Sequence, residues 1–167
     1  MLDKKIENAL NHQINLEFTA AYEYLSMAAY FDGLNLAGFS SWMVKQHQEE
    51  LMHAMKLFHY IHARSGRVAL EAIHKPFCDF KTPRDAFVKA LDLERANTKA
   101  IYDLYTLATQ IADYATQSHL KWFLDEQVEE EKLLDEARSL LEIAGDDKSA
   151  LLMLNDKFAG RAGAGKE

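Results

Sequence analysis

Four long stretches of the chain repeat apolar residues at alternating steps of three and four positions. This period matches one face of an amphipathic α-helix, which completes a turn every 3.6 residues. The pattern predicts helices over about 6–31, 37–64, 83–111 and 114–144, and a shorter apolar segment predicts a fifth over about 149–158. Only 7 glycines and 2 prolines interrupt the chain. The sequence therefore predicts an all-α protein, a four-helix bundle followed by one short helix.

The breaks between these segments predict how the helices are connected. Tight turns join the first helix to the second and the third to the fourth, because only a few residues separate them. The stretch 66–82 is longer than the roughly 2–8 residues usual between bundle helices, and it is long enough to return along the whole bundle. We therefore expect a long crossover between the second and third helices. We also expect a single domain over 1–167, with a flexible Gly/Ala-rich tail over 160–167.

Each of the four apolar stripes contains a glutamate near its middle. These glutamates are Glu17, Glu50, Glu94 and Glu130, and His53 lies one turn after Glu50 on the same helical face. An unpaired carboxylate buried in a helix bundle carries a large desolvation penalty, and four together require cations to neutralise them. The pattern therefore predicts a metal centre inside the bundle.

The tight turns place the four glutamates at one height, because residues equally distant from the turn of an antiparallel hairpin lie side by side. The midpoint between Glu17 and Glu50 falls in the first predicted turn. The midpoint between Glu94 and Glu130 falls on Ala112, in the second. At about 1.5 Å of rise per residue, each glutamate lies roughly 25 Å from its turn. All four side chains are thus expected to meet near the middle of the bundle.

The composition of this ligand set indicates which metal it holds. Four carboxylates balance two divalent cations, and calcium or magnesium would make little use of the imidazole of His53. Zinc favours closed tetrahedral sites rich in nitrogen and sulfur when it is structural. Mixed carboxylate and imidazole ligands suit two iron ions, with manganese as a competitor. Two Fe(II) ions can together deliver two electrons to one O₂, so the pattern indicates an oxidase site.

Two further features lie close to the predicted centre. Tyr24 follows Glu17 by seven residues on the same stripe, where a packed core tyrosine is the ordinary interpretation and a hydrogen-bonding or redox role is the alternative. The acidic run 126–131 would ordinarily form a solvated helix face. Glu49, directly before Glu50, raises the alternative that part of this run binds metal.

Composition and charge restrict the partners. A formal charge of -7 on 167 residues argues against nucleic-acid binding and mildly favours cations. Cys78 is the only cysteine, so an intrachain disulfide is excluded and a reducing compartment is favoured. No stretch is apolar over a length that predicts a membrane span or a signal peptide. The sequence therefore indicates a cytoplasmic protein with no membrane or nucleic-acid partner.

The residues of the predicted centre also resemble a known family. The resemblance is to prokaryotic non-haem ferritins, covers nearly the whole chain, and is carried by Glu17, Tyr24, Glu49-Glu50-x-x-His53, Glu94 and the stretch 122–132 (WFLDEQVEEEK). It implies a ferritin-like four-helix bundle that stores iron as ferric mineral in a hollow 24-subunit shell. It also implies ferroxidase activity, the oxidation of Fe(II) by O₂ or H₂O₂.

The resemblance further implies the part that each ligand takes. Glu17, Glu50 and His53 would hold one iron, with Glu50 bridging to a second. Glu94 and Glu130 would hold that second iron, giving two iron ions per subunit. The other residues that the resemblance adds are a polar neighbour of the pair and three carboxylates that, with Glu130, match a third iron site: Gln127, Glu49, Glu126 and Glu129.

Departures from related families refine this expectation. In bacterioferritins the haem methionine directly follows the glutamate of the second helix, and Leu51 occupies that position here, so no haem is expected. The resemblance places the apolar residues Leu151, Leu152 and Leu154 around a symmetry axis of the shell. Two alternatives stay open from the residues themselves. One is a small di-iron oxidase that acts on an organic substrate without caging mineral, and the other is a non-enzymatic helical interaction module.

Overall fold

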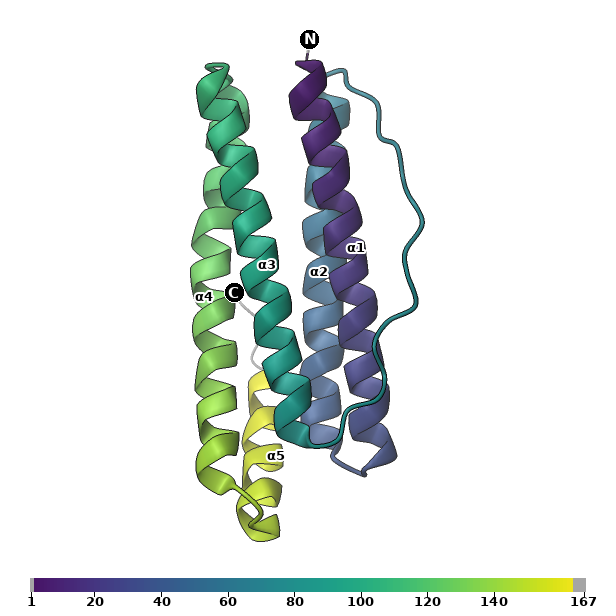
Figure 1. The fold of residues 1–167 in the computed structure, drawn as a ribbon, viewed down its shortest axis with the longest axis vertical. Helices are drawn as coiled ribbons and strands as arrows, with labels where there is room; N and C mark the ends of the chain where they lie inside the picture. Colours follow the sequence, from purple (N-terminus) through teal and green to yellow (C-terminus); the bar gives the residue numbers. More distant parts are fainter. Residues whose placement is uncertain (1, 164–167) are drawn as a thin grey trace.

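The computed structural model describes residues 2–163, and these residues form five helices arranged as an elongated bundle (Figure 1). The first two helices form one antiparallel hairpin and the next two form another, and the short last helix lies at one end of the bundle. The helices are α1 (Lys4–Gly33), α2 (Ala37–Ala63), α3 (Pro83–Gln110), α4 (Tyr114–Ala144) and α5 (Lys148–Gly163). The predicted all-α fold, with four long helices and one short one, is confirmed.

The C-terminal helix differs from its predicted extent. Helix α5 runs to Gly163, beyond the predicted end at 158 and into the stretch predicted as a flexible tail. Gly160 lies inside this helix and does not end it, although glycine is a poor helix former. The rest of the predicted tail, 164–167, lies outside the described residues.

The tight turns use left-handed residues that are not glycines. Asn35, Ser65 and Ala112 have φ angles of 58°, 56° and 57°, and each lies two residues after the last residue of a helix. Gly33 is the last residue of α1 and does not itself take a left-handed conformation. Both short turns still reverse the chain where predicted, so Glu17 and Glu50 face each other across one hairpin.

The crossover between α2 and α3 runs along the outside of α1 and returns the chain to the opposite end of the bundle (Figure 1). Near one end, the Asn11 side chain donates to the Arg67 carbonyl at 3.0 Å and accepts from the Ala69 amide at 2.8 Å. Near the other end, the Ser26 hydroxyl donates to the Phe77 carbonyl at 2.7 Å. Helix α3 therefore starts beside the start of α2, as the length of the crossover predicted.

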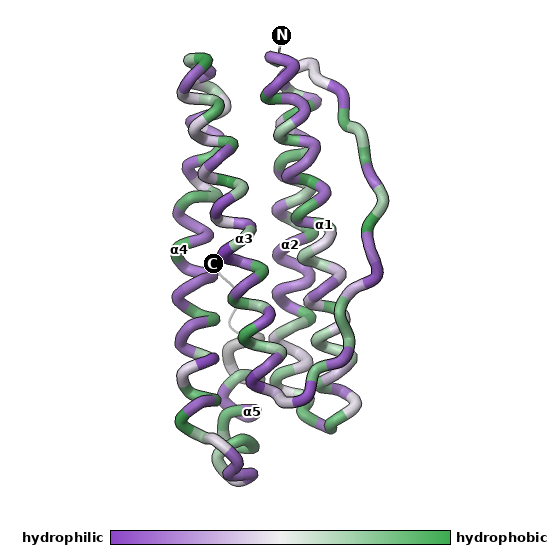
Figure 2. The backbone as a smooth tube through the Cα atoms, viewed as in Figure 1, coloured by the Kyte–Doolittle hydropathy of each residue, from purple (hydrophilic) through white to green (hydrophobic). Residues whose placement is uncertain are grey.

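Buried apolar residues form two clusters, one toward each end of the bundle. The cluster nearer α5 is rich in aromatic rings, whereas the other is mainly aliphatic. Figure 2 shows hydrophilic and hydrophobic residues alternating along each long helix, as expected for helices with one buried face. Buried polar side chains belong to neither cluster, and those near the middle of the bundle include Glu17, Glu50, Glu94 and Glu130. The core is thus apolar at both ends and polar in the middle.

Helix α5 is locked onto the start of α2. Phe158 is fully buried, with its ring 5.3 Å from that of Phe39 and 5.7 Å from that of Trp42. Asn155 Oδ1 accepts from the backbone amides of Gly38, at 2.9 Å, and Phe39, at 3.1 Å, and so supplies a cap for α2 from another helix. A Cβ atom on Gly38 would lie 1.8 Å from the Asn155 carbonyl oxygen, so this close approach requires glycine.

The opposite end of the bundle is closed by a polar network. Arg64, at the end of α2, forms a two-point ion pair with Asp113, the N-cap of α4, with N–O distances of 3.0 and 3.1 Å. The Thr116 hydroxyl donates to Asp113 at 2.8 Å and lies 2.8 Å from the Tyr60 hydroxyl. These contacts join the two hairpins at this end.

Candidate metal centre

Three of the predicted ligands converge in the middle of the bundle. Glu17 comes from α1, and Glu50 and His53 come from successive turns of α2. One potential ligand atom from each lies within 4.8 Å of the others. His53 Nδ1 lies 3.4 Å from Glu50 Oε1 and 3.9 Å from Glu17 Oε2. These distances leave room for one cation between a carboxylate, a second carboxylate and an imidazole nitrogen.

Glu94 and Glu130 complete the buried acidic layer from the second hairpin. Their exposed fractions are 0% and 1%, and their negative charges both act on Glu50. The Tyr24 hydroxyl donates to Glu94 Oε1 at 2.6 Å, and the Gln46 side chain donates to Glu130 Oε2 at 2.7 Å. Each of these carboxylates is therefore held by a donor from the first hairpin.

Glu50 differs from the other carboxylates of the layer. Both of its oxygens are buried and accept no hydrogen bond. Burial, followed by the negative charges of Glu94, Glu17 and Glu130, raises the pKa of Glu50 well above its ordinary value. A carboxylate in this position is a poor resting anion and a ready ligand for a cation, which would supply the missing charge partner.

The pKa values of two neighbouring groups respond to the same environment. Burial raises the pKa of Glu94 to about 7, although hydrogen bonds from Tyr24 and Gln127 oppose the rise. Burial and the charge of Glu94 raise the pKa of the Tyr24 phenol well above its ordinary value. The phenol therefore stays protonated and donates to Glu94. The hydrogen-bonding interpretation of Tyr24 is thus present in the structure, and its redox role stays a prediction.

Gln127 lies at the centre, where its amide nitrogen faces Glu94. Gln127 Nε2 donates to Glu94 Oε2 at 3.1 Å and to Thr98 Oγ1 at 3.1 Å. The Thr98 hydroxyl in turn donates to Glu131 Oε1 at 2.6 Å. In this arrangement Gln127 holds a neighbouring carboxylate in place. Its direct ligation of a metal stays a prediction.

Sequence reasoning missed two buried amides that contact Glu17. Gln13 donates to Glu17 Oε1 at 2.9 Å, and Asn97 donates to Glu17 Oε2 at 3.1 Å. Gln13 precedes Glu17 by four residues and Asn97 follows Glu94 by three, so each shares a helical face with a predicted ligand. A search for polar residues at these spacings would have found both.

The predicted third-site carboxylates lie on α2 and α4. Glu126 is buried, Glu49 is partly buried and Glu129 is exposed. Among the described residues, they do not gather into a group of three ligand atoms as compact as that of Glu17, Glu50 and His53. The third iron site therefore stays a prediction.

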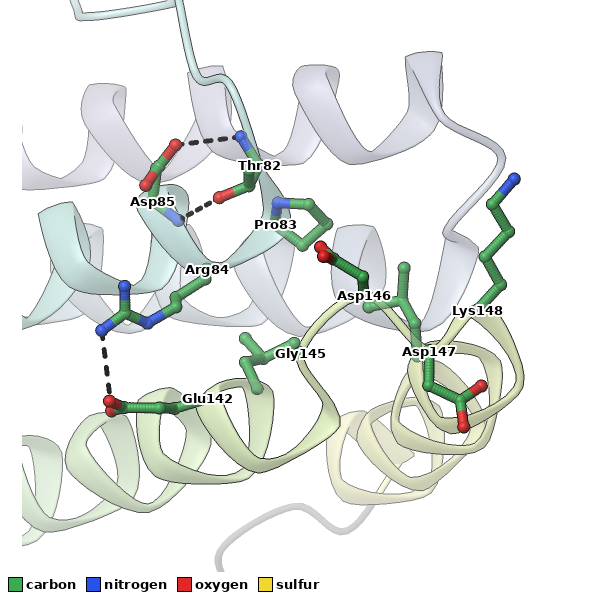
Figure 3. Close-up of a pocket in the computed structure, with 11 residues that line it drawn as sticks. Thr82, Pro83, Arg84, Asp85, Glu142, Gly145, Asp146, Asp147 and Lys148 are labelled. Carbon is green, nitrogen blue, oxygen red and sulfur yellow. Dashed lines mark hydrogen bonds and ion pairs between the residues drawn. The ribbon is translucent and has the colours of Figure 1, made fainter.

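A cleft of about 550 Å³ at the end of the bundle is a separate feature (Figure 3). It lies between the start of α3, where Thr82 and Asp85 form a capping box, and the turn from α4 to α5. Arg84 and Glu142 form an ion pair of 3.6 Å across it, with both side chains about half exposed. Such a surface pair contributes little stability. The cleft holds none of the predicted site residues, so it is not part of the metal centre.

Comparison with known proteins agrees with this architecture. The sequence profile of the Ferritin-like domain family matches residues 7–144. A bacterial non-heme ferritin of Staphylococcus aureus (strain USA300) is 38% identical over 161 residues, which are 96% of this chain and 97% of the relative. A bacterial non-heme ferritin of Staphylococcus saprophyticus is 38% identical over 162 residues, 97% of each chain.

Solved structures give the same result. The open pore ferritin of the archaeon Archaeoglobus fulgidus superposes with a TM-score of 0.94 at 45% identity, over 95% of this chain and 98% of that one. A humanized archaeal ferritin gives a TM-score of 0.94 at 44% identity, over 95% and 96% of the two chains.

Fold and site together define a helical-bundle protein with a buried group of carboxylates and one imidazole that could hold a metal ion, an arrangement for which ferritin-like di-iron proteins are the usual example. The chain belongs to the ferritin family. Membership in this family supports iron storage and Fe(II) oxidation as its function. Within residues 2–163, no helix combines the length and apolar character needed to cross a bilayer.

Proposed function

We propose that this chain is a ferroxidase that oxidises Fe(II) at a di-iron centre within each subunit and stores the product as ferric mineral inside a protein shell. One observation carries the proposal. In a member of the ferritin family, Glu50 is fully buried with both oxygens lacking hydrogen-bond partners, beside the potential ligand atoms of Glu17 and His53. A cation between these groups would remove the cost of burying the charge.

The ligands divide between two iron positions. Glu17 and His53 bind the first Fe(II), and Glu50 bridges it to the second. Glu94 and Glu130 bind the second, and their contacts with Tyr24 and Gln46 support this role by fixing both carboxylates. The other residues of the catalytic and metal-binding sets are the hydrogen-bond donor Tyr24, the neighbour Gln127 and the third-site carboxylates Glu49, Glu126 and Glu129.

The chemistry balances with two iron ions. Each Fe(II) gives up one electron, so a filled pair reduces one O₂ by two electrons, and two protons complete H₂O₂. H₂O₂ as the oxidant would accept the same two electrons together with two protons and yield two water molecules. Leu51 offers no ligand atom for haem iron, so we propose that the protein works without haem.

Exposed apolar side chains at one end of the subunit support the proposal of a shell. Ile143 is 83% exposed, Met153 73% and Leu152 56%. Leu151 and Leu154 are partly buried and pack against the aromatic core of their own subunit, and their place at a symmetry axis stays a prediction. Successive residues of a helix point about 100° apart, so Leu152 faces away from this core. We propose that the exposed set lies between subunits of a 24-mer.

A small di-iron oxidase that acts on an organic substrate is the remaining alternative. It would use the same carboxylates but would not assemble a cage. Light scattering at neutral pH distinguishes the two, because a 24-mer of 19.1 kDa subunits is far larger than a monomer or dimer. If light scattering detects nothing larger than a monomer or dimer, the storage shell is contradicted and the di-iron centre is left as that of a small oxidase. A cytoplasmic location stays a prediction.

The site is tested by stopped-flow oxidation of Fe(II). The metal-free parent is expected to oxidise two Fe(II) per subunit in a fast phase, and His53→Ala is expected to lose that phase. His59→Ala is the matched control, because His59 is an exposed imidazole on the same helix. Slow oxidation on mineral surfaces can persist in every variant. A fast phase of parent amplitude in His53→Ala would remove the assigned site.

A further inference from the structure

Two buried amides lie against the metal centre where α1 meets α3. Gln13 is 2% exposed and Asn97 is 5% exposed, so water hardly competes for their hydrogen bonds. Asparagine and glutamine are usually found at the surface. A buried amide is stable only when its polar atoms are hydrogen-bonded. The partners of these two side chains therefore indicate their purpose.

The amides form a closed set of hydrogen bonds with Glu17. Gln13 Nε2 donates to Glu17 Oε1 at 2.9 Å and also donates to Asn97 Oδ1. Asn97 Nδ2 donates to Glu17 Oε2 at 3.1 Å. Because its oxygen accepts from Gln13, the Asn97 amide is fixed with its nitrogen toward the carboxylate. Both oxygens of Glu17 are thus held in one orientation by donors on the side of α1 and α3.

Asn97 also lies one turn after Glu94 on α3. Its hydrogen bond with Glu17 therefore joins the α1 carboxylate directly to the helix that carries Glu94. This bond links the backbone positions of a carboxylate from each of the two hairpins. Glu17 belongs to the first iron position and Glu94 to the second.

We propose that Asn97, oriented by Gln13, is a positioning residue that couples the two metal positions. The inference rests on the di-iron function proposed above. By holding Glu17 and Glu94 at a fixed separation across the contact of α1 with α3, the amide makes the two positions fill as a pair. It acts through the carboxylates and is not itself a ligand. Removing such an outer partner typically lowers metal affinity or activity by about 10- to 100-fold.

Cobalt(II) is the probe, because its visible absorption reports the coordination of each bound ion without a redox reaction. The metal-free parent is expected to bind two Co(II) per subunit. Asn97→Leu is expected to weaken this binding by about 10- to 100-fold and to change the absorption spectrum. In this variant Co(II) is expected to fill the two positions one after the other and not as a pair. Gln13→Met keeps a similar volume and is expected to cause a smaller loss in the same direction.

The matched control is Thr116→Val. Thr116 is fully buried and hydrogen-bonded, but it lies in the polar network at the end of the bundle. This variant is expected to lose stability while keeping the stoichiometry, affinity and spectrum of bound Co(II). The same loss of binding in Thr116→Val would reduce the amide effect to general destabilisation and overturn the inference.

The remaining outcomes are distinguishable. Parent-like titrations and spectra in both amide variants would overturn the role of Asn97 and leave the metal centre in place. If Asn97→Leu does not fold, Gln13→Met decides alone, and a parent-like titration overturns the inference. A parent that binds no Co(II) would overturn the proposed function together with this inference.

Discussion

The metal layer consists of the buried carboxylates and the imidazole of the candidate metal centre, and the aromatic layer is the ring-rich cluster nearer α5. Both layers are built on the same helices, yet they have opposite effects on the stability of the metal-free fold. In the aromatic layer, Phe31, Phe39 and Phe87 are fully buried, with ring centroids 5.2–5.8 Å apart. In the metal layer, Glu50 is equally buried and both its oxygens lack hydrogen bonds. The first arrangement stabilises the fold, and the second costs stability until a cation binds. The comparison indicates that the apolar ends of the bundle support an unfavourable centre, as is common at functional sites.

Truncation should have opposite effects in the two layers, and this is the largest expected effect. Phe87→Ala removes a fully buried ring and is expected to destabilise the metal-free protein by about 3–5 kcal/mol. Glu50→Ala removes a buried carboxylate surrounded by negative charge and is expected to leave the metal-free protein at least as stable as the parent. Thermal melts of metal-free samples at equal subunit concentration measure both. A loss of several kcal/mol in Glu50→Ala would show that this carboxylate contributes to packing.

The dependence of stability on pH should sharpen the same comparison. The folded pKa of Glu50 is raised, so above the unfolded value of 4.5 the folded state binds more protons than the unfolded state. Stability must therefore fall as pH rises toward the folded pKa, by at most about 1.4 kcal/mol per pH unit for one group. The free energy of unfolding of metal-free Glu50→Gln is therefore expected to increase relative to that of the parent as pH rises from about 5 toward neutral.

Comparing variant with parent removes the contribution of other groups. His119 in particular acts in the opposite sense, because burial and then the charge of Lys56 lower its pKa to about 4. Between that value and the ordinary histidine pKa of 6.5, His119 makes stability rise with pH. Denaturant unfolding at several pH values gives the difference between Glu50→Gln and the parent. Parallel curves for the two proteins would contradict the raised pKa.

The smallest expected effect concerns the hydrogen bonds by which helix α5 caps the start of α2 beside the aromatic layer. Asn155→Ala removes the side chain that accepts from the Gly38 and Phe39 amides, and a lost helix cap typically costs about 1 kcal/mol. The melting temperature should fall slightly while Co(II) binding is unchanged, since the metal layer lies elsewhere in the bundle. Asn155→Asp keeps the acceptor and is the control. Weakened Co(II) binding in Asn155→Ala alone would mean that the two layers are coupled.

Much of this arrangement follows from the sequence, because a period of 3.6 residues and short turns leave few ways to pack four long helices. The pattern placed Glu17, Glu50 and His53 on facing stripes at one height, and the structure brings their ligand atoms together. Helix ends were predicted within a few residues, except that α5 extends further. The sequence did not predict which residues adopt the left-handed backbone conformation. Asn35 and Ala112 do so, although a glycine or an aspartate, which are common in such turns, lies nearby in each case.

Only the tertiary structure decided which polar side chains hold the carboxylates. Gln13 and Asn97 come from helices in different hairpins, and their hydrogen bonds with Glu17 depend on the rotation of each helix and on side-chain rotamers. The close contact of Gly38 with Asn155 likewise joins residues far apart in the chain. Periodicity determines which face of a helix is buried, because it depends only on local geometry. The partner of each buried group depends on distances between helices, which no local pattern encodes.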